Sequence, residues 1–267
     1  MSIEGSFSAL YQEAHKMNCM FSMGRWLLLL AISYLLLPAA GSATDDGFRQ
    51  QRLELVEVIE ADVRRTSSHL DRESLDERVL DVLREVPRHL FVPEGSRAEA
   101  YENRPLAIGH GQTISQPYIV AIMTDLLKPK QGHRVLEVGT GSGYQAAVMA
   151  KLTKEVFSME IIEPLGVQAS QRLRQLGYDN VQVRIGDGYY GWEQHAPFDA
   201  IIVTAAASHV PPPLVKQLKP GGRMIIPVGS AFMVQQLVLI EKSAAGEVTL
   251  KQILPVRFVP LTGEHGG

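Results

Sequence analysis

The chain of 267 residues is 45% hydrophobic and 21% charged, and its formal net charge at pH 7 is −3. This composition is ordinary for a globular protein, and the length suits one α/β domain with a sizeable core and an N-terminal addition. Proteins that bind nucleic acid tightly usually carry a basic face, so the net charge argues against such a partner. The chain contains no internal repeat and no low-complexity segment.

The first 43 residues differ from the rest of the chain. Trp26–Leu37 is an almost unbroken apolar run that follows Arg25 and precedes the small residues of Pro38–Ala43. A basic flank, a short apolar core and small residues are the marks of a secretory signal peptide, and the run is short for a membrane-spanning helix, which takes about 20 residues. The alternative is an internal start, such as Met17, with a signal-like run that occurs by chance.

Cleavage after Ala43 would leave the net charge at −3, because residues 1–43 contain two basic and two acidic side chains. It would also remove Cys19, the only cysteine, and with it any disulfide or thiol nucleophile. We therefore expect a signal-peptide-like segment at 1–43 and a folded domain at 44–267. The domain is expected to comprise N-terminal helices at 47–86 and a core at about 130–267.

Two amphipathic helices are predicted at the start of the domain. Apolar residues recur at helical spacing from Phe48 to Arg65 and again from Ser74 to Val86. In the second helix Ser74 is the predicted N-cap, Glu77 completes a capping box, and Pro87 ends the helix. The charged residues of both helices are interpreted as solvated faces without a function.

The segment 107–118, with the sequence AIGHGQTISQPY, leads into an apolar helix predicted at Tyr118–Leu127. Its two glycines, hydroxyl pair and proline predict a structured loop at the entry of that helix. From residue chemistry alone, Ser115 is best interpreted as the helix N-cap. Pro117 then lies in the first turn, where its missing N–H costs nothing.

The chain is organised around residues 134–144, with the sequence RVLEVGTGSGY. A short apolar strand runs into a turn with three glycines, and a helix follows at Gln145–Leu152. This is the first unit of an open α/β sheet, whose ligand crevice lies at the carboxyl end of the strand. Glycines allow unusual backbone angles and let a ligand approach bare backbone, and the helix start offers unpaired N–H groups.

The spacing of the glycines indicates the ligand. A dinucleotide loop reads G-x-G-x-x-G, whereas here Gly139, Gly141 and Gly143 give G-x-G-x-G, with Glu137 two residues before the first. The pattern E-x-G-x-G-x-G after a strand resembles motif I of S-adenosylmethionine (SAM)-dependent methyltransferases. The alternative is a glycine-rich turn of another nucleotide-binding fold.

Strands alternate with helices after the glycine turn. Strands are predicted at 156–159, 181–185, 198–203 and 223–228, helices at 164–176 and 212–218, and two last strands at 234–241 and 248–256. Such alternation predicts a mostly parallel, doubly wound sheet. A turn at Gly246 makes the last two strands a C-terminal antiparallel hairpin. The predicted fold class is therefore α/β.

Three acidic residues, Glu137, Glu160 and Asp187, fall at the carboxyl ends of successive strands, where crevice ligands bind. A carboxylate can accept hydrogen bonds from a ribose diol at Glu160, from an amino group at Glu137 and from the adenine amine at Asp187. The alternative is that each residue is a helix N-cap. Three such residues in register with a G-x-G-x-G loop favour SAM as the ligand.

Over roughly residues 50–264, the sequence resembles the protein-L-isoaspartate (D-aspartate) O-methyltransferases. The matching stretches are VPRHLFVP at 86–93, GHGQTISQPY at 109–118, the glycine motif, GDG at 186–188, APFDAIIVTAA at 196–206, LKPGG at 218–222, PVG at 227–229 and RFVPLT at 257–262. Many methyltransferases share the glycine motif and GDG, whereas QTISQP and RFVPLT are far more restrictive. The N-terminal extension departs from this usually cytosolic family.

The resemblance implies a Rossmann-like SAM-dependent methyltransferase fold, with Ser115 as the active-site residue between the SAM methyl group and the substrate carboxylate. A capping role would be compatible with this one. The implied cofactor-binding residues are Gln112, Thr113, Ile114, Ser115, Glu137, Gly139, Gly141, Gly143, Glu160, Ile161, Asp187, Gly188 and Thr262. The implied lining of the substrate trough is Ile114, Ser115, Val259, Pro260 and Leu261.

The implied activity is methyl transfer from SAM to the free α-carboxylate of L-isoaspartyl and D-aspartyl residues in damaged proteins, which begins their repair through a succinimide. The expected partners are therefore damaged proteins and peptides, without nucleic acid. No metal is expected, because the histidines are scattered and form no Cys/His cluster. Ser115 also lacks the G-x-S-x-G elbow of a serine hydrolase.

Two alternative functions remain. One is a SAM-dependent methyltransferase of another carboxylate, a small molecule or nucleic acid, and the other is a non-enzymatic SAM- or peptide-binding module. The location is also open to two interpretations. SAM is charged and made in the cytosol, so we expect a cytosolic enzyme, with membrane contact only if the N-terminal segment is retained. Export to the periplasm through residues 17–43 is the alternative.

Overall fold

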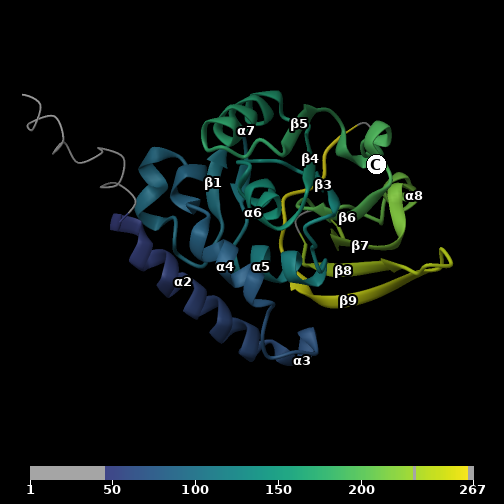
Figure 1. Ribbon diagram of the computed structural model, residues 1–267, viewed down its shortest axis with the longest axis horizontal. Coiled ribbons are helices and arrows are strands. Elements are labelled where there is room, and N and C mark those ends of the chain that lie inside the picture. Colours follow the sequence, from purple (N-terminus) through teal and green to yellow (C-terminus); the bar gives the residue numbers. More distant parts are fainter. Residues whose placement is uncertain (1–45, 231–232, 264–267) are drawn as a thin grey trace, which may run out of the picture. The chain divides into compact units, whose positions relative to one another are not determined.

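Within the described residues, seven strands form the central sheet of the computed structural model (Figure 1). The structure describes residues 46–230 and 233–263, so the signal-like segment predicted at 1–43 lies outside the described residues. The sheet belongs to a compact unit that begins at Phe48. None of the described helices is both long and apolar enough to cross a membrane.

The strands of this sheet are β3 (Arg134–Val138), β4 (Glu155–Glu160), β5 (Val181–Ile185), β6 (Phe198–Val203), β7 (Leu218–Val228), β8 (Gln235–Lys242) and β9 (Val248–Val256). Their order is β5-β4-β3-β6-β7-β8-β9. Strands β3 to β7 pair in parallel, and β8 and β9 are antiparallel. The predicted α/β class and the C-terminal hairpin are confirmed. The strand order reverses beside β3, so a ligand crevice is expected at its carboxyl end.

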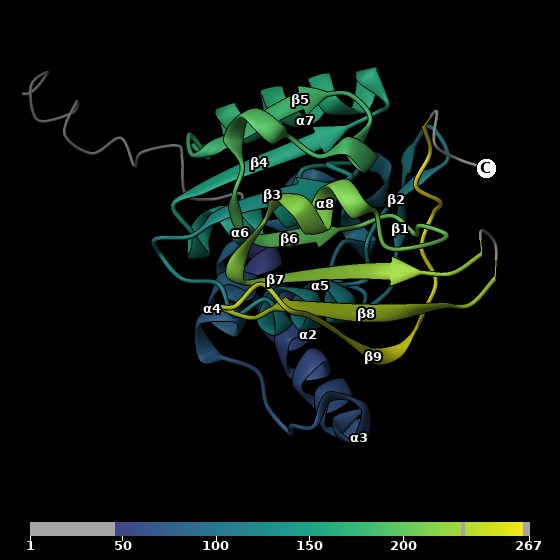
Figure 2. The same cartoon turned by 90° about the vertical axis from the view of Figure 1, so that its right-hand side faces the viewer.

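Helices cover both faces of the sheet. They are α2 (Asp46–Arg65), α3 (Ser67–Leu70), α4 (Glu77–Glu85), α5 (Pro117–Leu126), α6 (Tyr144–Leu152), α7 (Glu163–Gln175) and α8 (Pro212–Gln217), with short 3-10 turns η2 (Arg88–Phe91), η3 (Glu94–Glu99), η4 (Gly188–Tyr190) and η5 (Glu193–His195). One apolar core joins Val135 and Ile202 to α2, α4, α5 and α6. The other joins Leu136 and Ile201 to α8, which lies on the near side of the sheet in Figure 2.

Helix α4 begins at Glu77, so the predicted Ser74 cap and its capping box are wrong. The N-cap is Asp76, whose side chain accepts a hydrogen bond from the backbone N of Arg78 (3.0 Å). The backbone N of Asp76 in turn donates to Asp125 Oδ1 on α5 (2.7 Å), and Asp125 also pairs with Arg72. This buried carboxylate, distant in sequence, fixes the chain before the helix and sets where the helix starts.

The predicted loop before α5 contains a small antiparallel hairpin. Its strands are β1 (Leu106–Gly109) and β2 (Gln112–Ile114). The tight turn between them takes positive φ at three successive residues, including the non-glycine His110 (φ 53°). The hairpin ends immediately before Ser115 and α5, so it delivers this serine to the edge of the sheet.

The C-terminal tail returns across the carboxyl end of β6. The backbone N of Ala206 donates to the carbonyl oxygen of Val259 (2.8 Å), and the N of Leu261 donates to the carbonyl oxygen of Ala206 (2.7 Å). These bonds hold the segment 259–261 beside the residues that follow β6. The tail therefore lies at the same edge of the sheet as the glycine turn.

Candidate active site

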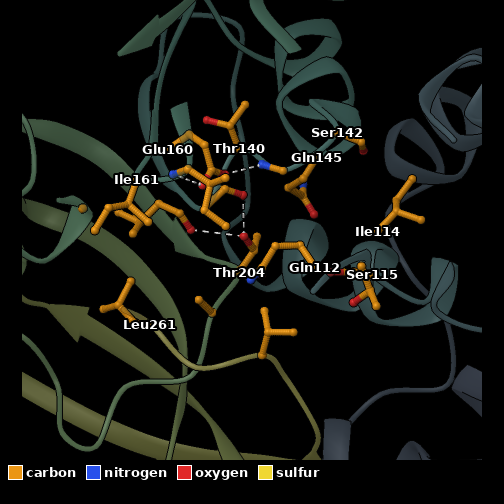
Figure 3. Close-up of a pocket in the computed structure, with 18 of the residues that line it drawn as sticks. Gln112, Ile114, Ser115, Thr140, Ser142, Gln145, Glu160, Ile161, Thr204 and Leu261 are labelled. Atoms are coloured by element: carbon orange, nitrogen blue, oxygen red, sulfur yellow. Dashed lines mark hydrogen bonds between the residues drawn. The ribbon is translucent and has the colours of Figure 1, made fainter. Parts of the chain in front are cut away.

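A cavity opens at the carboxyl ends of β3, β4 and β6 (Figure 3). Segments far apart in the sequence contribute to it: β2 with Ser115, the glycine turn, the end of β4, and the tail. The lining residues that the sequence predicted are Gln112, Thr113, Ile114, Ser115, Gly139, Gly141, Glu160, Ile161, Gly188, Val259, Pro260, Leu261 and Thr262. The fold thus brings most of the predicted site together.

The glycine turn presents bare backbone to the cavity. Gly139, Gly141 and Gly143 all have positive φ, at 97°, 52° and 88°. A Cβ atom at Gly139 would lie 2.5 Å from Thr204 Oγ1, which donates a hydrogen bond to the Gly139 carbonyl oxygen (2.7 Å). The close approach of Thr204 therefore requires glycine, and it fixes the turn in a shape that leaves room for a ligand.

Glu160 braces this turn from the end of β4. Its Oε2 accepts a hydrogen bond from the backbone N of Gly141 (2.7 Å), and its Oε1 accepts one from the N of Ile162 (2.9 Å). A carboxylate offers about four acceptor positions, so these two bonds leave capacity for a ligand. Because Glu160 also lines the cavity, it can hold two hydroxyl groups of a ribose.

Glu137 is placed differently from the prediction of a direct ligand contact. It is 0% exposed and does not line the cavity. Its Oε2 accepts a hydrogen bond from Ser158 Oγ, which also contacts Thr140 Oγ1 (2.5 Å) in the glycine turn, whereas its Oε1 has no partner within the described residues. Burial raises the pKa of Glu137 to about 8, which favours its neutral form. Through Ser158 and Thr140, this neutral side chain supports the glycine turn from beneath.

Gly143 and Asp187 also lie outside the lining of the cavity. Gly143 is the N-cap residue of α6, and a Cβ atom there would lie 3.2 Å from Leu173 on α7. Asp187 caps η4, because its Oδ1 accepts a hydrogen bond from the backbone N of Tyr189 (2.9 Å). The neighbouring Gly188 lines the cavity, so Asp187 holds the edge of the space.

Ser115 lies at the junction of two cavities. A second cavity of about 380 Å³ adjoins the first, and both are lined by Thr113, Ser115, Thr204 and Val259. The interpretation of Ser115 as the N-cap of α5 is wrong, because the N-cap residue is Gln116, whose own side chain makes no capping hydrogen bond. Its hydroxyl is therefore available to a ligand that spans the junction.

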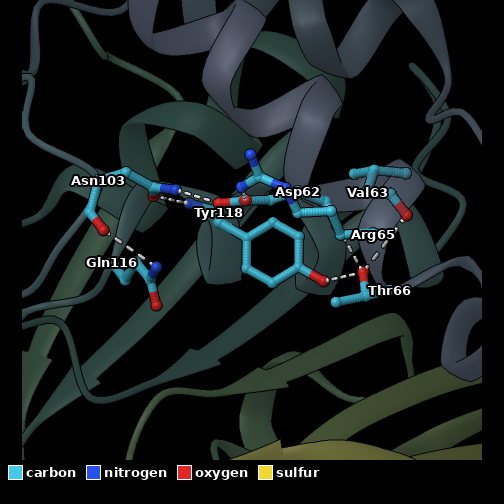
Figure 4. Close-up of polar contacts among 7 residues, drawn as sticks. All are labelled: Asp62, Val63, Arg65, Thr66, Asn103, Gln116 and Tyr118. Atoms are coloured by element: carbon cyan, nitrogen blue, oxygen red, sulfur yellow. Dashed lines mark hydrogen bonds and ion pairs between the residues drawn. The ribbon is translucent and has the colours of Figure 1, made fainter.

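A hydrogen-bond network holds the turn that carries Ser115 (Figure 4). Asn103 Oδ1 accepts from the backbone N of Tyr118 (3.0 Å), and the Asn103 carbonyl oxygen accepts from Gln116 Nε2 (3.0 Å). Asn103 Nδ2 donates to Asp62 Oδ2 on α2 (2.7 Å). Asn103 therefore satisfies a free N–H in the first turn of α5, the task that the sequence predicted for Ser115.

Several lining residues were not predicted from the sequence. They are Val120, Val138, Thr140, Ser142, Tyr144, Gln145, Met159, Ile162, Thr204 and Ala205. Thr140 and Ser142 stand between the glycines, and Thr204 directly follows β6, so position within a motif or at a strand end could have indicated them. Gln145 carries no such signal, because only the rotation of α6 decides which of its residues faces the cavity.

Within the described ranges, no group of three His, Cys, Asp or Glu side chains could hold a metal ion.

Comparisons with known proteins agree with this geometry. The family model described as protein-L-isoaspartate(D-aspartate) O-methyltransferase matches residues 67–266. Protein-L-isoaspartate O-methyltransferase 2 of Polaromonas sp. is 68% identical over 211 residues, which are 79% of this chain and 100% of that protein. Protein-L-isoaspartate O-methyltransferase 2 of Syntrophobacter fumaroxidans is 60% identical over 244 residues, which are 91% of this chain and 98% of that protein.

Two solved structures are also similar. One is a protein-L-isoaspartate O-methyltransferase, with a TM-score of 0.67 and 29% identity, over 79% of this chain and 67% of the other. The second, from Plasmodium falciparum, is described as a protein-L-isoaspartate O-methyltransferase in complex with S-adenosyl-L-homocysteine. Its TM-score is 0.63 at 27% identity, over 79% of this chain and 98% of the other.

Proposed function

We propose a function from the family to which the chain belongs, that of the protein-L-isoaspartate(D-aspartate) O-methyltransferases. The protein transfers a methyl group from SAM to the free α-carboxylate of L-isoaspartyl and D-aspartyl residues in damaged proteins. The observation that carries the proposal is the junction of two cavities at Ser115. One cavity has the glycine turn and acidic strand end that suit SAM, and the other is a trough beside the C-terminal tail. A methyl donor and a peptide can therefore meet at one hydroxyl group.

The residues of the first cavity fit SAM. Gly139 and Gly141 line the space without a side chain, and Gly188 has no room for one, because a Cβ atom there would lie 2.4 Å from Val138. We propose that Glu160 binds the ribose hydroxyls, that Ile161 and Gly188 contact the adenine ring, and that Asp187 acts at its edge. The remaining contacts are assigned to Gln112–Ser115, Gly139, Gly141 and Thr262, which line the same space. Glu137 and Gly143 are assigned an indirect role, through the shape of the turn.

The reaction needs alignment more than acid–base chemistry. The substrate carboxylate is ionised at neutral pH, since an α-carboxyl group has a pKa of about 3.5. When bound, SAM supplies a sulfonium methyl group, which the carboxylate oxygen takes in line while the S–CH₃ electron pair stays on sulfur. We propose that Ser115 donates a hydrogen bond to this carboxylate and orients it. Orientation of this kind can be worth effective molarities of about 10⁵ to 10⁸ M.

The C-terminal tail supports the peptide side of the proposal. Val259 lines both cavities, whereas Pro260 and Leu261, with Ile114, line the first. A peptide that lies along the tail would bring its isoaspartyl carboxylate to Ser115. The methyl ester then cyclises to a succinimide without further help from the protein, because the backbone nitrogen that follows displaces methanol, and hydrolysis returns part of the product to normal aspartate.

The test is methyl transfer from labelled SAM to an isoaspartyl peptide, with the normal aspartyl isomer as the matched control. We expect base-labile label, released as methanol, in the isoaspartyl peptide alone. Equal labelling of both peptides, or of neither, would overturn the proposal. Normal SAM binding together with no labelling of either peptide would favour a methyltransferase of another carboxylate or small molecule.

We further propose that residues 44–267 form the methyltransferase domain and that it works in the cytosol. The match over residues 67–266 supports the domain, and the need for SAM, a charged molecule made in the cytosol, supports the location. Cell fractionation with N-terminal sequencing of the purified protein tests both. A periplasmic chain that begins at Thr44 would overturn the location.

A further inference from the structure

Gln145 is a buried polar residue in the wall of the first cavity. It lies in the first turn of α6, lines the cavity and is 7% exposed. Its Nε2 donates a hydrogen bond to Thr124 Oγ1 on α5 (3.0 Å), and Thr124 is 0% exposed. The amide nitrogen is therefore held away from the cavity, and the amide oxygen remains available. Figure 3 shows the Gln145 side chain in the space between Glu160 and Ser115.

The charges around the cavity leave a role for such an oxygen. The amino-acid end of SAM carries an ammonium group, which needs acceptors when it is taken out of water. Within the described residues, Glu160 is the only acidic residue of the lining. The capacity that its bonds from Gly141 and Ile162 leave is assigned above to the ribose hydroxyls. Glu137, the acidic residue predicted for the amino group, is buried outside the cavity. An ammonium group in this cavity must therefore find neutral acceptors.

We propose that Gln145, oriented by Thr124, accepts a hydrogen bond from the α-ammonium group of SAM. This inference rests on the proposed function, and it names a binding residue that the sequence did not predict. Ser115 stands two residues before α5 and Thr124 lies within it. Helix α5 therefore carries the residue that orients Gln145 and begins close after the serine at the substrate.

The test compares three ligands by isothermal titration calorimetry, without turnover. SAM carries the amino-acid end, decarboxylated SAM keeps the amine but lacks the carboxylate, and 5′-methylthioadenosine lacks both. Gln145→Met keeps the length of the side chain and removes its amide. We expect this variant to bind SAM and decarboxylated SAM about tenfold or more weakly, as for a lost hydrogen bond to a charged group. Binding of 5′-methylthioadenosine should stay within about twofold of the unaltered protein, a difference of about 0.4 kcal/mol.

Two further variants sharpen this test. Thr124→Val removes the hydroxyl at nearly constant shape, and it should give a smaller loss for the same two ligands. Gln51→Met, at an exposed position of α2, makes the same chemical change away from the cavity and should bind all three ligands normally. Retained binding of 5′-methylthioadenosine also demonstrates that each variant is folded.

The outcomes separate this inference from the proposed function. If the unaltered protein binds SAM and Gln145→Met binds it equally tightly, only the role of Gln145 is overturned. The same follows if 5′-methylthioadenosine weakens as much as SAM, or if decarboxylated SAM is unaffected. If the unaltered protein does not bind SAM at all, the proposed function fails and this inference fails with it.

Discussion

Replacement of Glu137 by glutamine should remove a pH dependence from the stability of the fold. Glu137 is 0% exposed, accepts a hydrogen bond from Ser158, and has no ion-pair partner among the described residues. Burial, with a smaller contribution from the charge of Glu160, raises its pKa from 4.5 to about 8. The side chain is therefore protonated in the folded protein at neutral pH. Glutamine keeps the shape and an acceptor for Ser158 but cannot ionise.

The size of the effect follows from the two pKa values. Between pH 4.5 and about 8 the folded protein keeps a proton on Glu137 that the unfolded chain has lost. The stability linked to this proton is fully present below the unfolded pKa, and it is lost as the pH rises through the folded pKa. Each pH unit within the window lowers the free energy of unfolding by about 1.4 kcal/mol, and roughly 5 kcal/mol is the upper bound for the whole window.

Urea unfolding at pH 5, 6, 7 and 8 measures this effect. As the pH rises to 8, the free energy of unfolding of the unaltered protein should fall relative to that of Glu137→Gln. The difference in favour of the variant should therefore grow with each pH step. Glu57→Gln, at an exposed position on α2, controls for the loss of one carboxyl group. Parallel pH curves for the unaltered protein and Glu137→Gln would refute the assignment of a buried, protonated Glu137.

Ser115→Ala should lower methyl transfer to an isoaspartyl peptide about tenfold or more while SAM still binds and the midpoint of thermal unfolding hardly moves, because Ser115 does not cap α5; near-normal turnover would contradict its role. Glu160→Gln should weaken SAM binding about tenfold or more in calorimetry, since it removes the charge of a cavity acceptor; undiminished affinity would count against a ribose contact. Asp125→Ala should lower the free energy of unfolding in urea by about 3 kcal/mol, because Arg72 and the backbone N of Asp76 lose their acceptor; unchanged unfolding would refute this. Arg257 is the only charged residue that lines the second cavity within the described chain. Arg257→Gln should therefore raise KM, with little change in kcat, for isoaspartyl peptides with a neighbouring glutamate and not for those with a neighbouring lysine. Equal effects on both peptides would exclude charge recognition.

Much of the fold could be predicted from local pattern. Strands β5, β6 and β9 begin and end at the predicted residues, since each is a run of strand-forming residues with turn or loop residues at its ends. The β1–β2 hairpin was not predicted, because strands of four and three residues are too short to show a period. The start of α4 and the cap of α5 depend on Asp125 and Asn103, which are distant in sequence. At α5 a remote side chain supplies the capping acceptor, and at α4 a remote carboxylate holds the backbone of the local cap, Asp76. Local capping rules therefore failed at both helices.

The candidate site was predicted in outline because acidic residues and glycines mark the carboxyl ends of parallel strands. Which of these residues reach the ligand depends on features that the sequence leaves open. Gly188 lines the cavity while the adjacent Asp187 does not, and Gln145 faces it through the rotation of α6. Ser115 was predicted as a site residue only from the resemblance to a family. Its residue chemistry alone predicted that it is the N-cap of α5, which it is not in the structure.

The contrast between Glu137 and Glu160 explains this limit in physical terms. Glu137 pairs in register with Ser158, two residues before Glu160, so the two carboxylates share a face of the sheet. They differ in depth, because β3 and β4 pair only as far as Val138 and Met159, and Glu160 lies beyond that last pair. At about 3.3 Å per residue, Glu160 stands about 7 Å nearer the open edge. Because of this distance, Glu137 lies protonated beneath the turn while Glu160 is an acceptor in the cavity. The distance depends on the register between β3 and β4.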